Sequence, residues 1–373
     1  MRLAALALLL AASPVAAQAP IDARATRETR NLLANMHALA GDAVMFGHQN
    51  TLEYGHDWRN EPNRSDVKDV TGDFPAVYGL DLMDMFRLDR PDEVDPAGAA
   101  KLRRFVREAH ARGGVVTFSW HMANPVNDTN AWNTTPAVAA IIPGGKLHAD
   151  YRAKLDEVAS FFGSLTDARG RPIPVWFRPF HEHTGAWFWW GKGNTSAADF
   201  VSLWRFTVRY LRDEKRIHNL LYAYSTDVFD SEQAFFEFYP GDAYVDMLGF
   251  DDYHKTPEVR AKFVWRLQQV VRWARARRKL AALTETGVEA VPDPKWWTGT
   301  LLPALTASPG ISYVLVWRNA NRAHEKREHY FAPFPGQASA ADFVAFYKHP
   351  LTAFERDLPP LYADPGVTPG KRR

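Results

Sequence analysis

The chain has 373 residues, of which 46% are hydrophobic and 24% are charged, a composition that excludes wholesale disorder. The formal net charge is only +2, and Lys and Arg are scattered among acidic residues, so nucleic-acid binding has little support. The sequence contains no Cys, which excludes disulfides and a cysteine nucleophile.

The first 19 residues have the pattern of a secretory signal peptide. Arg2 supplies positive charge, residues 3–12 form a short apolar stretch, and the small residues Ala17 and Ala19 offer cleavage positions. The apolar stretch is too short to anchor the chain in a bilayer, and no later run is long or apolar enough to span one. We therefore expect a soluble protein that is secreted or periplasmic.

Eight short apolar runs, each followed by a helix-like stretch or a polar loop, predict strands. They lie at residues 43–47, 76–80, 115–120, 174–180, 220–224, 245–250, 280–283 and 312–317. Amphipathic segments between them, at 99–112, 151–165, 197–211 and 261–276, predict helices.

This alternation predicts an α/β fold with a parallel sheet, and eight units predict closure into a (β/α)8 TIM barrel. We expect one catalytic domain over residues 20–358. A leading helix over 25–40 is expected to end at Gly41, and the Pro- and Gly-containing tail over 359–373 is expected to be disordered. The Asn-, Pro- and Thr-rich loop over 123–146 is expected to shape a cleft.

Polar side chains follow every predicted strand. In order they are His48, Asp81, His121, Glu182, Asp227, Asp251, Glu285 and Arg318. Barrel enzymes assemble their sites from the carboxyl ends of several strands, so these residues are candidates for one site. Glu182 and Glu285 are the strongest candidates because both follow apolar runs directly.

Paired carboxyl groups of this kind can cleave a glycosidic bond. Glu182 lies among Phe180, Trp187 and Phe188, so desolvation should raise its pKa and keep it protonated as the acid. Glu285 lies in a more polar stretch and is expected to be the nucleophile. A separation of about 5–5.5 Å and retention of configuration are expected for such a pair.

Glu285 should stay ionised if Arg178, Tyr253 or His181 reaches it across the barrel. His181 has two interpretations: it fixes Glu182 structurally, or, as we favour, it contacts Glu285 and tunes it. His121 is expected to contact sugar hydroxyls or the acid.

Several aromatic residues near the predicted strand ends are candidates for sugar-stacking platforms. Trp187 and Trp317 are the preferred ones, whereas Trp189 and Trp190 are equally well interpreted as core residues.

A metal site is the competing chemistry, because His48, His121, His181 and His183 could act with the carboxylates. The first strand end reads Gly47-His48-Gln49-Asn50 rather than His-x-His, and His183 is expected to point into a loop. We expect neither a metal nor another cofactor.

The segment from Arg178 to Gly191, Arg-Pro-Phe-His-Glu-His-Thr-Gly-Ala-Trp-Phe-Trp-Trp-Gly, resembles the acid/base segment of glycoside hydrolase family 26. Thr284-Glu285-Thr286-Gly287 resembles the nucleophile segment of that family. Further matches follow in the expected order at 46–49, 117–121, 249–253, 316–319 and 330–336, so the resemblance covers nearly the whole mature chain.

The resemblance implies a (β/α)8 barrel in which Glu182, after strand four, is the acid/base and Glu285, after strand seven, is the nucleophile of a retaining hydrolase. It further implies that His181 and Tyr253 orient the nucleophile. The residues that it implies for the substrate subsites are His121, Trp187, Trp317 and Arg318. One departure is His183-Thr184, which stands where many mannanases of the family have Met-Asn.

We therefore expect an endo-β-1,4-mannanase, monomeric, that acts on mannan, glucomannan or galactomannan. A β-1,3-xylanase or a mixed-linkage β-glucanase with the same machinery is the nearest alternative. A carbohydrate-binding barrel without catalytic activity is the alternative from another class, and the presence of both glutamates argues against it.

Overall fold

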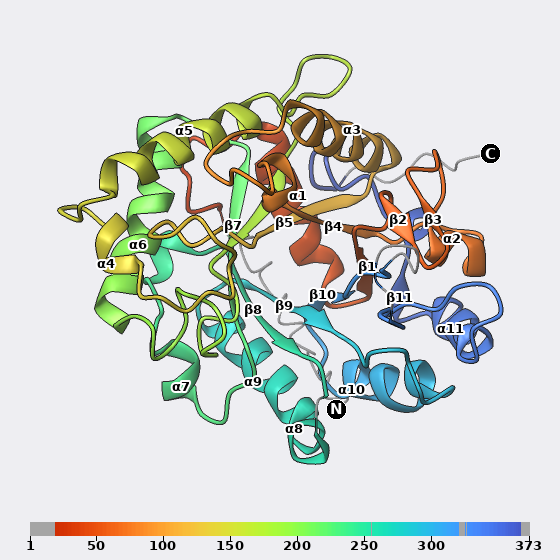
Figure 1. The fold of residues 1–373 in the computed structure, drawn as a ribbon. Helices are drawn as coiled ribbons and strands as arrows, with labels where there is room; N and C mark the ends of the chain where they lie inside the picture. The colour runs from red at the N-terminus through yellow and green to blue at the C-terminus, as the bar shows by residue number, and fades with distance from the viewer. Residues whose placement is uncertain (1–18, 255, 321–324, 326, 367–373) are drawn as a thin grey trace, which may run out of the picture.

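The computed structural model describes residues 19–254, 256–320, 325 and 327–366 (Figure 1). The predicted signal peptide, except for its last residue, lies outside the described residues, and so do residues 367–373 of the predicted tail. None of the helices in the described part of the chain has the length and apolar character needed to cross a bilayer.

Eight parallel strands form a closed barrel. They are β1 (Val44–Gln49), β4 (Val77–Asp81), β5 (Val115–Trp120), β6 (Val175–Pro179), β7 (Leu220–Thr226), β8 (Met247–Asp252), β9 (Leu280–Thr286) and β10 (Ile311–Val316). Each strand pairs with the next, and β10 pairs back to β1 with Met45 opposite Tyr313, which closes the cylinder. The predicted TIM barrel is confirmed.

Smaller strands lie outside the barrel. β11 (Thr352–Ala353) adds to β1, and β2 (Tyr54–Gly55) forms a hairpin with β3 (Trp58–Arg59).

Helices surround the barrel (Figure 1). The α-helices are α1 (Arg27–Leu39), α2 (Asp66–Thr71), α3 (Pro96–Arg112), α4 (Val138–Ile141), α5 (His148–Gly163), α6 (Ala197–Arg209), α7 (Glu232–Phe236), α8 (Pro257–Ala261), α9 (Phe263–Ala276), α10 (Leu302–Thr306) and α11 (Ala340–Tyr347). Short 3₁₀ or π turns are η1 (Leu82–Met85), η2 (Tyr210–Glu214), η3 (Asp242–Tyr244), η4 (Trp297–Leu301) and η5 (Glu355–Asp357).

The ends of the crossover helix α3 show why it begins and stops where it does. Asp95 caps its first turn by accepting a hydrogen bond from the Ala97 N–H, and Pro96 supplies a helical φ angle at the first position. Gly113 ends it with a φ of 91°, a conformation that favours glycine. The leading helix α1 instead ends at Leu39, two residues before the predicted stop at Gly41.

Strand β9 runs further than its apolar pattern suggests. The predicted run ended at residue 283, yet Glu285 and Thr286 continue to pair with Asp251 and Asp252 of β8. The candidate nucleophile therefore lies on the sheet itself and not on the loop that follows it.

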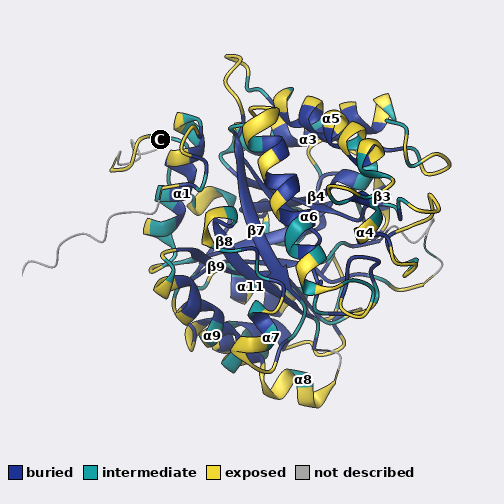
Figure 2. Ribbon diagram, turned by 90° about the vertical axis from the view of Figure 1, so that its left-hand side faces the viewer, coloured by how far each residue is buried: buried dark blue, intermediate teal, exposed yellow. Residues whose placement is uncertain are grey.

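The barrel interior and the space between strands and helices are separate apolar layers. Inside the barrel, Met45, Trp176 and Met247 pack together with Leu32 and Met36 of α1. In Figure 2 the central strands are buried, whereas the surrounding helices expose their outer faces. Because α1 covers the amino-terminal end of the barrel, the carboxyl-terminal end is left for a site.

The segment predicted to be a disordered tail begins with packed residues. Leu361 is fully buried, the Tyr362 hydroxyl donates to the Gly114 carbonyl at 2.7 Å, and Asn31 of α1 donates to Asp364 at 3.1 Å. The ordered chain thus extends beyond the predicted boundary at residue 358, because this segment completes the packing around α1.

Candidate active site

A cleft of about 700 Å³ opens at the carboxyl ends of the barrel strands. Its lining consists of His121, Trp132, His181, Glu182, Trp187, Phe188, Tyr253, His254, Glu285, Val288, Glu289, Trp317, His329 and Phe331. The predicted site residues all lie in this lining except Arg318.

Glu182 follows β6 on a sharply turned backbone. Phe180 and Glu182 have φ angles of 51° and 52°, a left-handed backbone conformation that is unfavourable for bulky residues. This turn is held by a hydrogen bond of 3.0 Å from the Glu182 N–H to the Ser225 carbonyl of β7. The strained backbone directs the Glu182 carboxyl into the cleft, where the indole Nε1 of Trp187 donates to its Oε2 at 2.6 Å.

Burial raises the pKa of Glu182 well above its usual value, and the charges of Asp251 and Glu285 raise it further. The hydrogen bond from Trp187 opposes this shift. The direction is the one expected from the aromatic neighbours in the sequence. A carboxyl group whose neutral form is favoured in this way is suited to donate a proton.

Glu285 is held from two sides. Arg178 of β6 donates from Nη2 to its Oε1, and the Tyr253 hydroxyl donates to its Oε2 at 2.5 Å. Burial opposes the charge on Arg178, but Asp251 and Glu285 raise the pKa of the guanidinium above its ordinary value. Glu285 therefore faces a permanent cation and a hydroxyl donor, one at each of its carboxyl oxygens.

Asp251, one of the strand-end candidates, lies between these two groups, and its contacts with them were not predicted. It accepts hydrogen bonds from Arg178 Nη1 at 3.0 Å, Ser225 Oγ at 3.0 Å and Thr284 Oγ1 at 2.6 Å. Burial and the charge of Glu285 raise the pKa of Asp251, against the effect of Arg178. The sequence placed Asp251 at a strand end but gave no sign that it shares Arg178 with Glu285.

The three buried carboxyls converge. One oxygen each from Glu182, Asp251 and Glu285 can be chosen so that all lie within 4.8 Å of one another. Such closeness is typical of the arrangement with about 5–5.5 Å between carboxyl groups, and is short of the roughly 6.5–9.5 Å that leaves room for an attacking water. With one guanidinium among three carboxyls, a neutral Glu182 relieves the excess negative charge.

His181 does not have the predicted contact with Glu285. Within the described residues no hydrogen bond joins the two, and Nδ1 of His181 is buried without a hydrogen-bond partner. Its ring instead lies 4.6 Å from that of His121 and 5.2 Å from that of Phe188, as measured between ring centroids. Burial, and then the charge of Arg178, lower its pKa well below the ordinary value. It is a neutral side chain in the cleft wall.

His183 was expected to point into a loop, and this prediction is wrong. Its ring is fully buried, Nδ1 bonds to the Phe180 carbonyl at 3.0 Å, and the ring packs against Phe200 and Tyr224. Glu182, between the two histidines, has a left-handed backbone conformation, and the rings of His181 and His183 have different neighbours.

The tryptophans after Glu182 divide between cleft and core. Trp187 lines the cleft, whereas Trp189 and Trp190 are fully buried. Gly185 makes the position of Trp187 possible, because a Cβ on Gly185 would lie 2.2 Å from the indole ring. Trp317 lines the cleft at the end of β10, as the sequence suggested.

Trp132 is a cleft residue that sequence reasoning missed. It belongs to the long loop that was expected to shape the cleft, is 53% exposed, and stacks on His121 with 5.1 Å between ring centroids and 17° between planes. The sequence feature that could have identified it is a single large aromatic residue in a loop of Asn, Pro and Thr residues.

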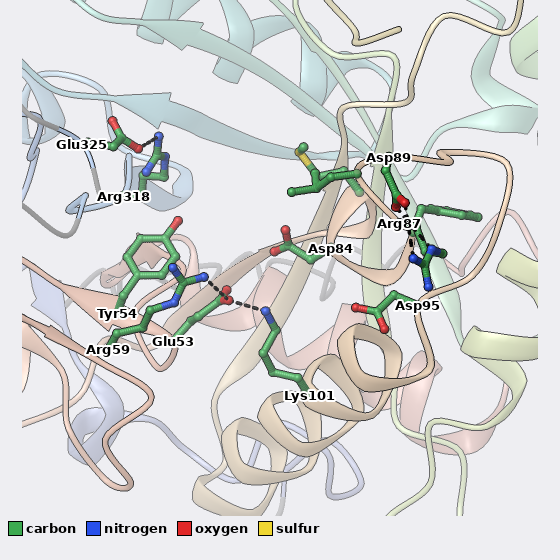
Figure 3. A pocket seen from close by; sticks show the side chains of 13 residues that line it. Glu53, Tyr54, Arg59, Asp84, Arg87, Asp89, Asp95, Lys101, Arg318 and Glu325 are labelled. Carbon is green, nitrogen blue, oxygen red and sulfur yellow. Dashed lines mark hydrogen bonds and ion pairs between the residues drawn. The ribbon is translucent and has the colours of Figure 1, made fainter. Parts of the chain in front are cut away.

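Arg318 lies in a neighbouring pocket of about 510 Å³ (Figure 3). It forms an ion pair with Glu325 and lies over the ring of Tyr54, 5.9 Å from its centroid. Glu53 and Lys101 form a second ion pair in this pocket. Arg318 is thus apart from the carboxyl pair, because successive residues at the end of β10 point to different sides.

A small depression of about 90 Å³ lies beside both spaces. It shares His121 and Trp132 with the cleft, and Phe86 and Leu88 with the charged pocket. The cleft and the pocket therefore both border this depression.

The histidines considered as metal ligands do not gather into a ligand set in the part of the chain that the structure describes. There, the carboxyls of Glu182, Asp251 and Glu285 have metal-ligand spacing. Two of them are already bonded to the guanidinium of Arg178, which places a positive charge beside this group.

Comparisons with known proteins agree with this geometry. Residues 21–321 match the profile of Glycosyl hydrolase family 26. A mannan endo-1,4-beta-mannosidase of Bifidobacterium adolescentis is 32% identical over 347 residues, which are 87% of this chain and 34% of that protein. A mannan endo-1,4-beta-mannosidase of Bacillus subtilis is 30% identical over 276 residues, which are 68% of this chain and 72% of that protein.

A solved structure, a GH26 beta-mannanase from Bacteroides ovatus, has 40% sequence identity and a TM-score of 0.85 over 92% of this chain and 100% of that one. The chain spans about a third of the length of the Bifidobacterium relative. Since the family profile covers most of its length and the barrel carries the carboxyl pair at its carboxyl-terminal end, the chain belongs to glycosyl hydrolase family 26.

Proposed function

We propose that this protein is an endo-β-1,4-mannanase that hydrolyses mannan, glucomannan or galactomannan with retention of configuration. The observation that carries the proposal is the buried pair of Glu182 and Glu285, whose oxygens approach within 4.8 Å and whose surroundings differ. Two carboxyls so close, one neutral and one beside a cation, are suited to a double displacement.

In the first step, the Glu285 carboxylate attacks the anomeric carbon of the sugar bound in the cleft. The glycosidic C–O bond breaks, and the proton of Glu182 passes to the leaving oxygen. Arg178 and Tyr253 hold the two oxygens of Glu285, so the nucleophile reaches the anomeric carbon without rearrangement.

In the second step, the ionised Glu182 takes a proton from a water that attacks the same carbon. The bond between Glu285 and the sugar breaks, and the original configuration returns. Removal of the leaving sugar unit makes room for this water.

Mannan is the proposed substrate because the relatives from Bifidobacterium and Bacillus carry that activity in their names. The aromatic faces of Trp187, Trp317 and Trp132 support binding of a sugar chain, since the C–H face of a pyranose packs on aromatic rings. Export of the chain and its monomeric state stay predictions.

The proposal is tested by reducing-sugar release from β-1,4-mannan, galactomannan, β-1,3-xylan and mixed-linkage β-glucan. We expect sugar release from the mannans, with products of several lengths. NMR spectra should show that the β-anomer forms first. Preference for the xylan or glucan would move the substrate to the nearest alternative. Binding to a polysaccharide without release from any would favour a binding barrel.

A further inference from the structure

We infer that Asp81 is a positioning residue, which fixes the imidazole of His121 with its proton on Nδ1 and so presents Nε2 to a hydroxyl group of the bound sugar. The inference rests on the proposed function only in that the ligand of the cleft is a sugar. Nothing in the sequence pattern linked these two strand-end residues, which come from β4 and β5.

The Asp81 carboxylate receives four donors. Its Oδ1 accepts hydrogen bonds from the backbone N–H groups of Met83 at 2.9 Å and His121 at 3.1 Å. Its Oδ2 accepts the Ser119 hydroxyl at 2.8 Å and lies 2.5 Å from His121 Nδ1. Both oxygens are therefore oriented, and the carboxylate cannot rotate without losing hydrogen bonds.

These contacts determine the tautomer of His121. Burial of Asp81 opposes its charge, but the charge and hydrogen bonds of His121 and the backbone donors lower its pKa below the ordinary value. An ionised carboxylate only accepts hydrogen bonds, so Nδ1 of His121 must be the donor. In the neutral ring the lone pair then belongs to Nε2.

The surroundings of the ring leave Nε2 for the ligand. Trp132 stacks on one face of His121, while Trp317 and His181 pack against the ring in T-shaped arrangements at centroid distances of 5.9 Å and 4.6 Å. His121 lines the cleft, and Nδ1 points to the buried Asp81. Nε2, on the opposite side of the ring, accordingly faces the cleft and accepts a hydrogen bond from a sugar hydroxyl.

The test is the variant Asp81→Asn, because the hydrogen bonds around residue 81 determine the orientation of the new amide group. The two backbone N–H groups require the amide oxygen at the Oδ1 position, which places the NH₂ group opposite Ser119 and His121 Nδ1. Nδ1 must then accept, and the proton moves to Nε2. Nitrogen NMR of protein with ¹⁵N-labelled histidine reports which ring nitrogen carries the proton, and the His121→Ala spectrum assigns the signal.

We expect Nδ1–H in the wild type, Nε2–H in Asp81→Asn, and a fall in kcat/KM on manno-oligosaccharides of about tenfold or more, the effect of losing one hydrogen bond. In the His121→Ala background, Asp81→Asn should add little, since Asp81 acts through His121. A purely structural role would instead give additive losses and would overturn the inference.

The chain offers a matched control. His218 Nδ1 lies 2.6 Å from Asp22 Oδ2, a second His–Asp pair in which Asp22 is buried and His218 half-buried, at the amino-terminal side of β7 and so opposite the cleft. Asp22→Asn should change the His218 signal and leave kcat/KM on manno-oligosaccharides within about twofold. If kcat/KM fell equally in Asp81→Asn and Asp22→Asn, the loss of activity would be due to reduced stability, and the inference would be contradicted.

Two outcomes separate this inference from the proposed function. A wild-type spectrum with the His121 proton on Nε2 would overturn the inference even if Asp81→Asn does not fold and even if the enzyme cleaves mannan. Absence of hydrolysis on all four polysaccharides would overturn the proposed function, while the tautomer measurement, made without substrate, would still decide the role of Asp81.

Discussion

The indole of Trp187 both lines the sugar cleft and donates a hydrogen bond of 2.6 Å to Oε2 of Glu182. One side chain therefore links substrate binding to the protonation of the acid. The bond favours the ionised form of Glu182 and partly offsets the effect of burial.

Trp187→Phe should keep an aromatic face but remove this donor. Because the bond lowers the pKa of Glu182, its loss raises that pKa further, and the alkaline limb of the kcat profile should move to higher pH. The measurement is kcat against pH on a mannan substrate. Trp132→Phe is the control, because Trp132 also lines the cleft but stacks on His121. An equal shift of the alkaline limb in that variant would contradict the role of the Trp187 hydrogen bond.

Glu285→Ala should lower kcat by about three orders of magnitude or more, because no covalent intermediate can form. Added azide should restore part of the turnover by attacking from the vacated side, with inverted configuration in the product. NMR of the glycosyl azide checks this. A near-native rate in Glu285→Ala would show that another group is the nucleophile.

Glu182→Ala should harm substrates with poor leaving groups far more than activated aryl glycosides, since only the former need a proton on the leaving oxygen. The ratio of kcat/KM values between manno-oligosaccharides and dinitrophenyl glycosides is the measurement. A uniform loss across both types would exclude Glu182 as the proton donor.

Tyr253→Phe should lower kcat by roughly tenfold to a hundredfold, the effect of losing a hydrogen bond to a charged group. The hydroxyl of Tyr253 holds Oε2 of Glu285, and burial together with the charge of Glu285 raises the pKa of Tyr253, so it remains a donor at any physiological pH. Steady-state kinetics with unchanged kcat would mean that Arg178 alone positions the nucleophile.

Arg178→Met should destabilise the fold by about 3–5 kcal/mol at neutral pH, because Asp251 and Glu285 would be buried without their cation. Arg178 lowers the pKa of Asp251, so its loss raises that pKa further above the unfolded value, and the folded variant gains stability relative to its unfolded chain as the pH falls and Asp251 takes up a proton. The deficit of the variant should accordingly shrink on acidification. Urea unfolding at several pH values checks it, and a constant deficit would contradict this account.

The barrel was predictable because its strands appear in the sequence as short apolar runs. The carboxyl pair was predictable because each glutamate lies at the end of such a run. Strand β5 alternates residues of the barrel interior, such as Val115, with residues that face the helices, such as Phe118. Glu182 and Glu285 each follow such a run, so the rule that barrel sites lie at strand ends was enough to pair them.

The positions of His181, His183 and Arg318 were not predictable in the same way. The positions of His181 and His183 depend on local backbone turns, above all the left-handed Phe180 and Glu182, which no periodic pattern records. Asp81, Asp251 and Trp132 were missed as partners for a related reason: their contacts join different strands or a loop, and sequence spacing carries no information on such pairings.

Glu285 lies on a barrel strand and is tied to β6 through Arg178, whereas Glu182 lies on the turn beyond β6, braced by Trp187. The half of the reaction centre that forms the covalent bond is thus part of the barrel wall. The half that meets the departing sugar lies on the turn that follows the strand. Exchanging residues 183–191 for those of a relative should alter which departing groups are accepted while leaving the covalent step intact.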